Sequence, residues 1–332
     1  MTKILMMGTR KDETLFANQW AKDHDVSLTT STEFLNNETY HLLKGFDGLC
    51  LQQTMGLPDD MYARLKKDGF TQIAQRSAGV DMYHLEEAKR QGIKITNIPA
   101  YSPNSVAEFV VSSALNAIRH THAIQNRVSK HDFSWDQSIL SREIRSLTIG
   151  ILGTGKIGQI AAQIFKGFGA TVIGYDLYQN KSAKNFLTYK DDFDDFLKKS
   201  DIITIHMPLT PENYHQFNEE ALKKMKPGAI LINAARGGIV DTKALLKMVD
   251  SGHLSYCVLD TYENEMPFVT KDWTEKSLED PVLEALLEHE NIQYTPHIAF
   301  YTDMAIENLV CGGLQACLDI LKTGDSAYVV NR

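Results

Sequence analysis

The sequence predicts an α/β protein built from two doubly wound parallel sheets, and three observations lead to this prediction. The chain has 332 residues, which is long enough for two domains with sizeable cores. Short apolar runs typical of buried strands alternate with helical patterns through residues 1–99, and again from Leu147 to Ala299. One helical run, Tyr301 to Leu321, remains after the second series and is expected to return to the first domain. We therefore expect a discontinuous domain of residues 1–100 and 300–332, a domain of residues 101–299, and a cleft between them.

The first series begins at the N-terminus and contains no dinucleotide-binding motif after its first strand. Its predicted strands are Lys3–Met7, Val26–Thr29, Gly48–Gln52, Gln72–Gln75 and Ile93–Ile98. Its clearest predicted helices are Pro58–Lys67 and Tyr83–Gln91, the second of which ends before Gly92.

A long helix is predicted next. Apolar residues keep helical spacing from Val106 to about Val128, and Asn104 or Ser105 can cap the helix start. A long helix between two domains is usually a linker or a docking surface. The apolar content exceeds what a single stripe needs, so we interpret this helix after Pro103 as a subunit interface.

The second series opens with the stretch around which the chain is organised. An apolar run, Leu147–Leu152, leads into the sequence G-x-G-x-x-G formed by Gly153, Gly155 and Gly158. A helix is predicted to start near Ile157, and a strand, Thr171–Tyr175, follows it and ends on Asp176. The later predicted strands are Asp201–Met207, Ala229–Ala234, Cys257–Thr261 and Ile292–Thr295.

Each part of this motif suits a dinucleotide. The first glycine permits the tight turn, the second lets a pyrophosphate approach the backbone, and the third lets the helix lie close to the strand. The helix N-terminus favours the phosphate charge. Asp176 stands near the position where a carboxylate accepts from the ribose hydroxyls, and it would repel a 2′-phosphate. The pattern therefore predicts a Rossmann-type site that prefers NAD to NADP.

Three charged side chains follow later strands: Arg236, Glu265 and His297. Carboxyl ends of strands are where an open α/β sheet binds ligands. Each residue alone has an ordinary structural interpretation, as a surface ion pair, a loop acid or a buried histidine. Beside a nicotinamide they form a complete set for reducing a keto acid. Arginine binds a carboxylate with two hydrogen bonds, histidine gives and takes the proton, and a carboxylate on its other nitrogen fixes the tautomer.

Five ordered segments resemble the D-isomer-specific 2-hydroxyacid dehydrogenases, most closely their lactate-forming members. They are the glycine loop GTGKIG (153–158) and the segments HMPLTPENYH (206–215), NAARGGIVDT (233–242), LDTYENE (259–265) and TPHIAFYT (295–302). The resemblance covers essentially the whole chain. It implies NAD-dependent reduction of pyruvate or a related 2-keto acid to the D-2-hydroxy acid, a substrate domain, a coenzyme domain and a homodimer.

The resemblance also implies roles for individual residues. Arg236 would bind the substrate carboxylate, His297 would be the acid/base, and Glu265 would pair with His297. Further substrate contacts would be Gln52, Ala78, Gly79, Tyr101 and Phe300. Besides the glycines and Asp176, the NAD contacts would be Lys156, Ile157, Met207, Pro208, Asn213, Ala234, Ala235, Arg236 and Asp260.

One departure concerns the substrate. Lactate-forming members commonly carry tyrosine where this chain has Gln52, and losing that ring could widen the pocket toward bulkier keto acids such as phenylpyruvate or 2-ketoisocaproate. A second function class is an NAD-sensing binding protein on the same fold. Turnover of pyruvate with NADH would distinguish it from the enzyme.

Composition limits the other options. The formal net charge of −8 argues against binding to nucleic acid or to an anionic membrane surface. No apolar run approaches the roughly 20 residues that span a bilayer, and the N-terminus has no signal-peptide pattern. The four cysteines lack metal-binding spacing, and Cys311 and Cys317 are expected to be buried in a helix. We expect a cytoplasmic protein with reduced thiols and no metal.

Overall fold

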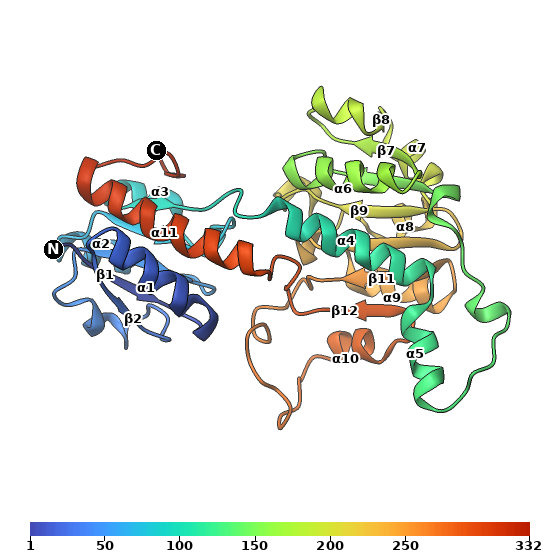
Figure 1. Ribbon diagram of the computed structural model, residues 1–332, viewed down its shortest axis with the longest axis horizontal. Helices are drawn as coiled ribbons and strands as arrows, with labels where there is room; N and C mark the ends of the chain where they lie inside the picture. The colour runs from blue at the N-terminus through green and yellow to red at the C-terminus, as the bar shows by residue number, and fades with distance from the viewer. The chain divides into compact units, whose positions relative to one another are not determined.

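The computed structural model describes residues 1–332 and divides into two compact units. Unit 1 comprises Met1–Ser102 and Tyr301–Arg332, and unit 2 comprises Pro103–Phe300. Each unit contains one parallel sheet, so the predicted class of two doubly wound α/β domains is confirmed. The chain's last helix belongs to the same unit as its first strands (Figure 1).

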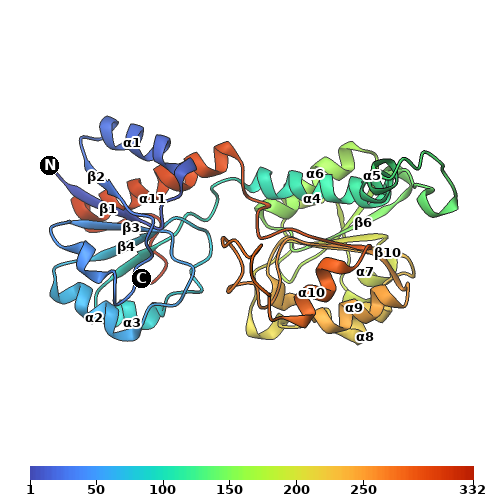
Figure 2. The same ribbon diagram turned by 90° about the horizontal axis from the view of Figure 1, so that it is seen from below.

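Unit 1 is a five-stranded sheet in the order β2-β1-β3-β4-β5, with every pair parallel. Its strands are β1 (Lys3–Met7), β2 (Ser27–Thr30), β3 (Gly48–Leu51), β4 (Gln72–Gln75) and β5 (Lys94–Thr96). Its helices are α1 (Thr14–Asp23), α2 (Asp59–Lys67), α3 (Leu85–Arg90) and α11 (Asp303–Thr323), with 3₁₀ turns η1 (Lys11–Glu13) and η2 (Tyr40–Leu43). Helices α1 and α11 lie on one face of the sheet, and α2 and α3 lie on the other (Figure 2).

The last helix corrects one expectation from composition. Helix α11 has 21 residues and a mean hydropathy of 1.3 in its most apolar window, so length and composition alone would allow it to cross a membrane. Its apolar side chains are instead buried in the core of unit 1, where the helix packs against α1, β3 and β4. Cys317 is buried in this contact, whereas Cys311, also expected to be buried, is only partly so. Helix α11 is a core helix of its unit.

Unit 2 is a seven-stranded parallel sheet in the order β12-β11-β10-β9-β6-β7-β8. Its strands are β6 (Thr148–Leu152), β7 (Thr171–Tyr175), β8 (Thr188–Tyr189), β9 (Ile202–Ile205), β10 (Ala229–Asn233), β11 (Leu254–Leu259) and β12 (Ile292–Tyr294). Its helices are α4 (Pro103–Ile118), α5 (Thr121–Ser129), α6 (Lys156–Gly167), α7 (Phe193–Lys199), α8 (Glu219–Lys224), α9 (Thr242–Asp250) and α10 (Pro281–Glu288). Its 3₁₀ turns are η3 (Gln137–Ile139), η4 (Ile144–Ser146), η5 (Ser182–Asn185), η6 (Pro211–Asn213) and η7 (Gly237–Ile239). Helices α4 and α6 lie on one face of the sheet, and α7 to α10 lie on the other (Figure 2).

The predicted single helix from Val106 to about Val128 is wrong. It is divided into α4 and α5 at His120, whose φ of +52° lies in the left-handed region and interrupts the helical path. Helix α4 begins at Pro103, since proline lacks only an N–H that the first turn does not use. Asn104 and Ser105 therefore lie inside the helix and do not cap it.

Candidate active site

The glycine loop lies at the switch point of the unit 2 sheet, where the strand order reverses between β6 and β9. Gly153 has a φ of +88°, and a Cβ there would lie 2.8 Å from the His206 carbonyl carbon at the end of β9. Gly158 packs directly on the Gly153 carbonyl oxygen. Only glycine satisfies both positions, because one needs a left-handed backbone and both need contact closer than any side chain permits.

The space in front of this loop is open. No atom lies within 4 Å of the place where a Cβ of Gly155 would stand, and α6 begins at the next residue with Lys156 and Ile157 in its first turn. The first N–H groups of this 12-residue helix have no partner within the helix, and no side chain fills the space beside Gly155 at its start. A ligand can therefore approach the backbone closely at this point. This arrangement fits the pyrophosphate of a dinucleotide.

Asp176 follows β7 directly, as predicted. Its Oδ2 accepts hydrogen bonds from the Thr154 N–H at 2.6 Å and the Thr154 hydroxyl at 2.9 Å, and its Oδ1 accepts from the Tyr178 N–H at 2.9 Å. The carboxylate is thus held beside the glycine loop.

The loop after β9 carries Met207, Pro208 and Asn213. The Asn213 amide donates to the Pro208 carbonyl oxygen at 2.8 Å and accepts from the Thr210 N–H at 2.7 Å. Asn213 therefore fixes the shape of its own loop. Met207 packs partly against the core of the unit.

Arg236 lies after β10 in a loop that is fixed on both sides. The Asn233 side chain donates to the Arg236 carbonyl oxygen at 2.9 Å and accepts from the Ala235 N–H at 3.0 Å. These two hydrogen bonds close a short turn that includes Ala234. Gly237, the next residue, packs directly on the backbone of Tyr262 and Glu263. The guanidinium donates to the Ala235 carbonyl oxygen at 2.8 Å. The contact at Gly237 joins the Arg236 loop to the loop that carries Glu265.

Glu265 and His297, which are 32 residues apart in the chain, form a close pair. The Glu265 Oε1 lies 2.7 Å from the His297 Nδ1, and the Glu265 Oε2 accepts from the Tyr262 N–H at 2.9 Å. The carboxylate is nearly buried, at 8% exposure, whereas the imidazole side chain is 35% exposed. Because Nδ1 is bound to the carboxylate, Nε2 is the nitrogen left to face a ligand.

Asp260 fixes the backbone around His297. Its carboxylate accepts from the Thr295 hydroxyl at 2.6 Å and from the N–H groups of Ile298 and Ala299, both at 2.9 Å. The His297 N–H donates to the Asp260 carbonyl oxygen at 2.8 Å, and His297 has a φ of +56°. Burial raises the pKa of the Asp260 carboxyl above its ordinary value, and the three hydrogen bonds oppose this shift. In this structure the Asp260 side chain serves the His297 loop.

The remaining predicted residues lie at strand ends of unit 1 or next to the unit boundary. The carbonyl oxygens of Ala78 and Gly79 accept from the side chains of Asn97 and Ser77, both at 2.6 Å, whereas their N–H groups make no hydrogen bond. The Gln52 side chain also makes none, although its Oε1 is buried. The Tyr101 carbonyl oxygen accepts from Asn308 at 2.6 Å, and Phe300 is partly exposed at the end of unit 2.

Sequence reasoning missed the buried group that holds the strand ends of unit 1. Arg76, 0% exposed, pairs with Glu13 at 3.2 Å and donates to the carbonyl oxygens of Met7, Gly8 and Cys50. Its guanidinium thereby connects the carboxyl ends of β1 and β3. Arg76 itself lies two residues before Ala78 in the chain. A charged residue directly after a buried strand was the only available signal.

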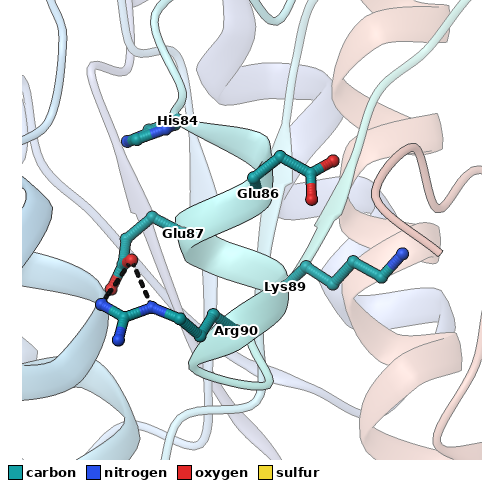
Figure 3. Close-up of a pocket in the computed structure, with 5 residues that line it drawn as sticks. All are labelled: His84, Glu86, Glu87, Lys89 and Arg90. Carbon is teal, nitrogen blue, oxygen red and sulfur yellow. Dashed lines mark hydrogen bonds and ion pairs between the residues drawn. The ribbon is translucent and has the colours of Figure 1, made fainter.

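A separate hollow of about 420 Å³ lies beside α3 (Figure 3). It is lined by His84, Glu86, Glu87, Lys89 and Arg90, none of which belongs to the predicted site. Glu87 and Arg90 point toward one another there and form an ion pair at 2.6 Å. The hollow contains none of the chemistry described above.

Comparison with known proteins identifies the family of this chain. Residues 111–299 match the family model of the D-isomer specific 2-hydroxyacid dehydrogenase, NAD binding domain. A D-lactate dehydrogenase of Staphylococcus aureus is 46% identical over 324 residues, which is 98% of each chain. The chain belongs to the D-isomer specific 2-hydroxyacid dehydrogenases. It is an NAD-dependent oxidoreductase acting on 2-hydroxy acids.

Solved structures resemble the whole dehydrogenase. A D-lactate dehydrogenase from Treponema pallidum is 40% identical, has a TM-score of 0.91 and is matched over 99% of both chains. A D-2-hydroxyisocaproate dehydrogenase is 37% identical, with a TM-score of 0.92 and complete coverage of both chains. The family and cofactor expected from the five sequence segments are therefore confirmed.

Proposed function

We propose that this dehydrogenase reduces pyruvate, or a closely related 2-keto acid, to the D-2-hydroxy acid. The observation that carries the proposal is the His297–Glu265 pair, because its 2.7 Å contact through Nδ1 leaves Nε2 as a proton donor. His297 gives its Nε2 proton to the oxygen of the keto group as that oxygen gains charge. Glu265 stabilises the imidazolium and holds the ring in one orientation. Bound NADH supplies the hydride.

Arg236 binds the substrate carboxylate in this proposal. Its guanidinium offers the paired N–H donors that a carboxylate accepts. The N–H groups of Ala78 and Gly79 bind the same carboxylate, and their lack of any other partner supports this role. Tyr101 and Phe300 provide aromatic surface next to the substrate.

The dinucleotide is proposed to contact the open glycine loop and three strand-end loops. Gly155, Lys156 and Ile157 face the pyrophosphate, Gly153 and Gly158 form the tight turn that lets it approach, and Asp176 accepts from the adenosine ribose. Residues after the later strands complete the proposed contact set: Met207, Pro208, Asn213, Ala234, Ala235, Arg236 and Asp260.

A preference for bulkier 2-keto acids is the second candidate. Gln52, at the end of β3, has a side chain with no hydrogen bond, and it replaces the aromatic ring common in lactate-forming members. The match to a D-2-hydroxyisocaproate dehydrogenase favours the same candidate. It changes the substrate's side chain and leaves the reaction unchanged.

Steady-state kinetics with NADH over pyruvate, 2-ketoisocaproate and phenylpyruvate test the proposal. We expect turnover of all three, with the highest kcat/KM identifying the preferred side chain, and a product that is the D enantiomer by chiral chromatography. An L product, or no NADH oxidation with any of the three, would overturn it.

We also propose a homodimer formed through α4, α5 and the segment that follows. Helix α5 has no buried residue, and Phe133, Trp135 and Leu140 are 73%, 87% and 66% exposed. Large apolar side chains gathered at a surface mark an interaction site. Light scattering of wild-type protein and of Trp135→Asp tests this, since a monomeric wild type would contradict it.

We propose that the protein is located in the cytoplasm. The four cysteines are free and three are buried, which fits a reducing compartment.

A further inference from the structure

A chain of hydroxyl groups reaches Asp176 from strand β8. The Tyr189 hydroxyl donates to the Thr154 hydroxyl oxygen at 2.6 Å, and the Thr154 hydroxyl donates to Asp176 Oδ2 at 2.9 Å. The Asn180 N–H donates to the Tyr189 hydroxyl oxygen at 2.9 Å. The Tyr189 hydroxyl also lies 3.4 Å from the Asn180 carbonyl oxygen, and its single proton is used in the shorter contact to Thr154. The protons of both hydroxyls are then directed toward the carboxylate.

The fold makes room for this chain at one position. Strand β8 has two residues and pairs only with the edge of β7, placing Tyr189 beside Gly174. A Cβ at Gly174 would lie 3.2 Å from the Thr154 methyl group and 2.9 Å from Leu187. The absent side chain thus lets Thr154 and the segment 177–189 approach each other over β7.

The hydrogen bonds fix both the position and the remaining capacity of the carboxylate. A hydroxyl has a single proton, so the Thr154 hydroxyl, which donates to Asp176, can only accept in its contact with the Tyr189 hydroxyl, and Tyr189 must be the donor. Bonds to a charged acceptor are the stronger ones, and linked donors strengthen one another. With three donors on Asp176, about one of its four lone-pair directions is left, and it lies on Oδ1.

We propose that Thr154 and Tyr189 are positioning residues that set the preference for NAD over NADP. They hold the Asp176 carboxylate where Oδ1 meets a ribose hydroxyl and a 2′-phosphate would be repelled. This inference depends on the proposed role of Asp176, and it adds two residues that touch neither the reacting atoms nor the catalytic pair.

The first test compares NADH with NADPH for Tyr189→Phe. We expect the dissociation constant and the KM for NADH to rise by about threefold to tenfold, as for one lost hydrogen bond in a charged network. The kcat, the KM for the keto acid and the kinetics with NADPH should stay unchanged, so the ratio of NADH to NADPH efficiency falls. Tyr256→Phe is the matched control, since the Tyr256 hydroxyl in the same unit makes no hydrogen bond. A Tyr189→Phe variant that loses thermal stability but keeps the NADH constants would overturn the inference.

Thr154 and Asp176 variants complete the test. Thr154→Val should weaken NADH binding at least as much as Tyr189→Phe. Thr154→Ser keeps the hydroxyl, so its NADH binding should match that of the wild type. In an Asp176→Ala background, Tyr189→Phe should have no further effect on NADH binding. A persisting effect would overturn the inference alone. An Asp176→Ala variant with unchanged cofactor preference would overturn both the ribose assignment and this inference.

Discussion

Two strands of the seven-stranded sheet, β9 and β12, are each followed by a histidine, and the two side chains have opposite surroundings. His206 after β9 has the Thr204 hydroxyl 3.0 Å from its Nε2, and its Nδ1 is buried without a partner. Burial lowers the pKa of His206 to about 4. His297 after β12 has a carboxylate, that of Glu265, 2.7 Å from its Nδ1.

The difference identifies what a strand-end histidine needs in order to act as an acid. Burial without a counter-charge keeps an imidazole neutral, so His206 is not the imidazolium acid near neutral pH. A carboxylate on Nδ1 favours the charged ring and directs Nε2 outward. Position at the end of a strand is shared by both residues, and the carboxylate is not.

Replacing the paired histidine should have the largest effect. His297→Gln removes the proton donor, so we expect kcat for keto acid reduction to fall by about 10²–10⁴-fold. NADH affinity, measured by fluorescence titration, should be unchanged because the glycine loop is unaltered. His206→Gln is the control and should retain more than about a tenth of the activity. The comparison fails if the His206 variant loses as much kcat as the His297 variant.

Removing only the charge should have the next largest effect. Glu265→Gln keeps a hydrogen-bonding group at His297 but no longer carries the charge that stabilises the imidazolium. We therefore expect kcat for reduction, measured by steady-state kinetics, to fall by about tenfold to a hundredfold, less than for His297→Gln.

Glu263→Gln is the matched control for that loss. Glu263 lies two residues away in the same loop and accepts from His215 and from the Thr242 N–H. Its replacement should leave kcat within about threefold of the wild type. An unchanged kcat in the Glu265 variant would show that this carboxylate is only a loop acid.

The strand ends that carry these side chains were predictable, because apolar runs followed by charged or glycine residues specify where a parallel sheet meets its ligand. The predicted strands Lys3–Met7, Gln72–Gln75 and Thr171–Tyr175 have the observed bounds. The break at His120 was not predictable, since a non-glycine residue with positive φ leaves no trace in hydrophobic spacing.

Contacts between distant residues were also beyond the sequence pattern. Tyr189 reaches Thr154 across 35 residues, and Arg76 reaches Glu13 across 63. Neither spacing is a motif, and each depends on which strands become neighbours in the sheet. Asp260 shows the same limit, because nothing in its position after β11 indicated that its carboxylate would hold the loop of His297.

The unpaired histidine should affect stability in acid. The pKa of His206 falls from 6.5 to about 4 on folding, so between these pH values the unfolded chain binds a proton at His206 and the folded chain does not. Its contribution is fully present above pH 6.5 and is lost as the pH falls toward 4. We expect the wild type to lose about 2 kcal/mol more unfolding free energy than His206→Gln between pH 7 and pH 4.5. Urea unfolding at the two pH values measures this, and equal losses would contradict the assignment.

The smallest effect is expected at another histidine–carboxylate pair of unit 2, His215 with Glu263. This pair tests whether the ring nitrogen that contacts the carboxylate decides the role of the histidine. His215 Nε2 lies 2.9 Å from the Glu263 carboxylate, and the imidazole stacks on Tyr214 with ring centroids 4.0 Å apart. Here the carboxylate occupies Nε2, the nitrogen that His297 keeps for a ligand. His215→Gln should therefore lower the unfolding free energy by about 1 kcal/mol, as for one lost hydrogen bond, and change kcat by less than about threefold. Thermal unfolding and steady-state kinetics measure the two quantities. A loss of kcat like that of His297→Gln would mean that the nitrogen facing the carboxylate does not decide which histidine transfers the proton.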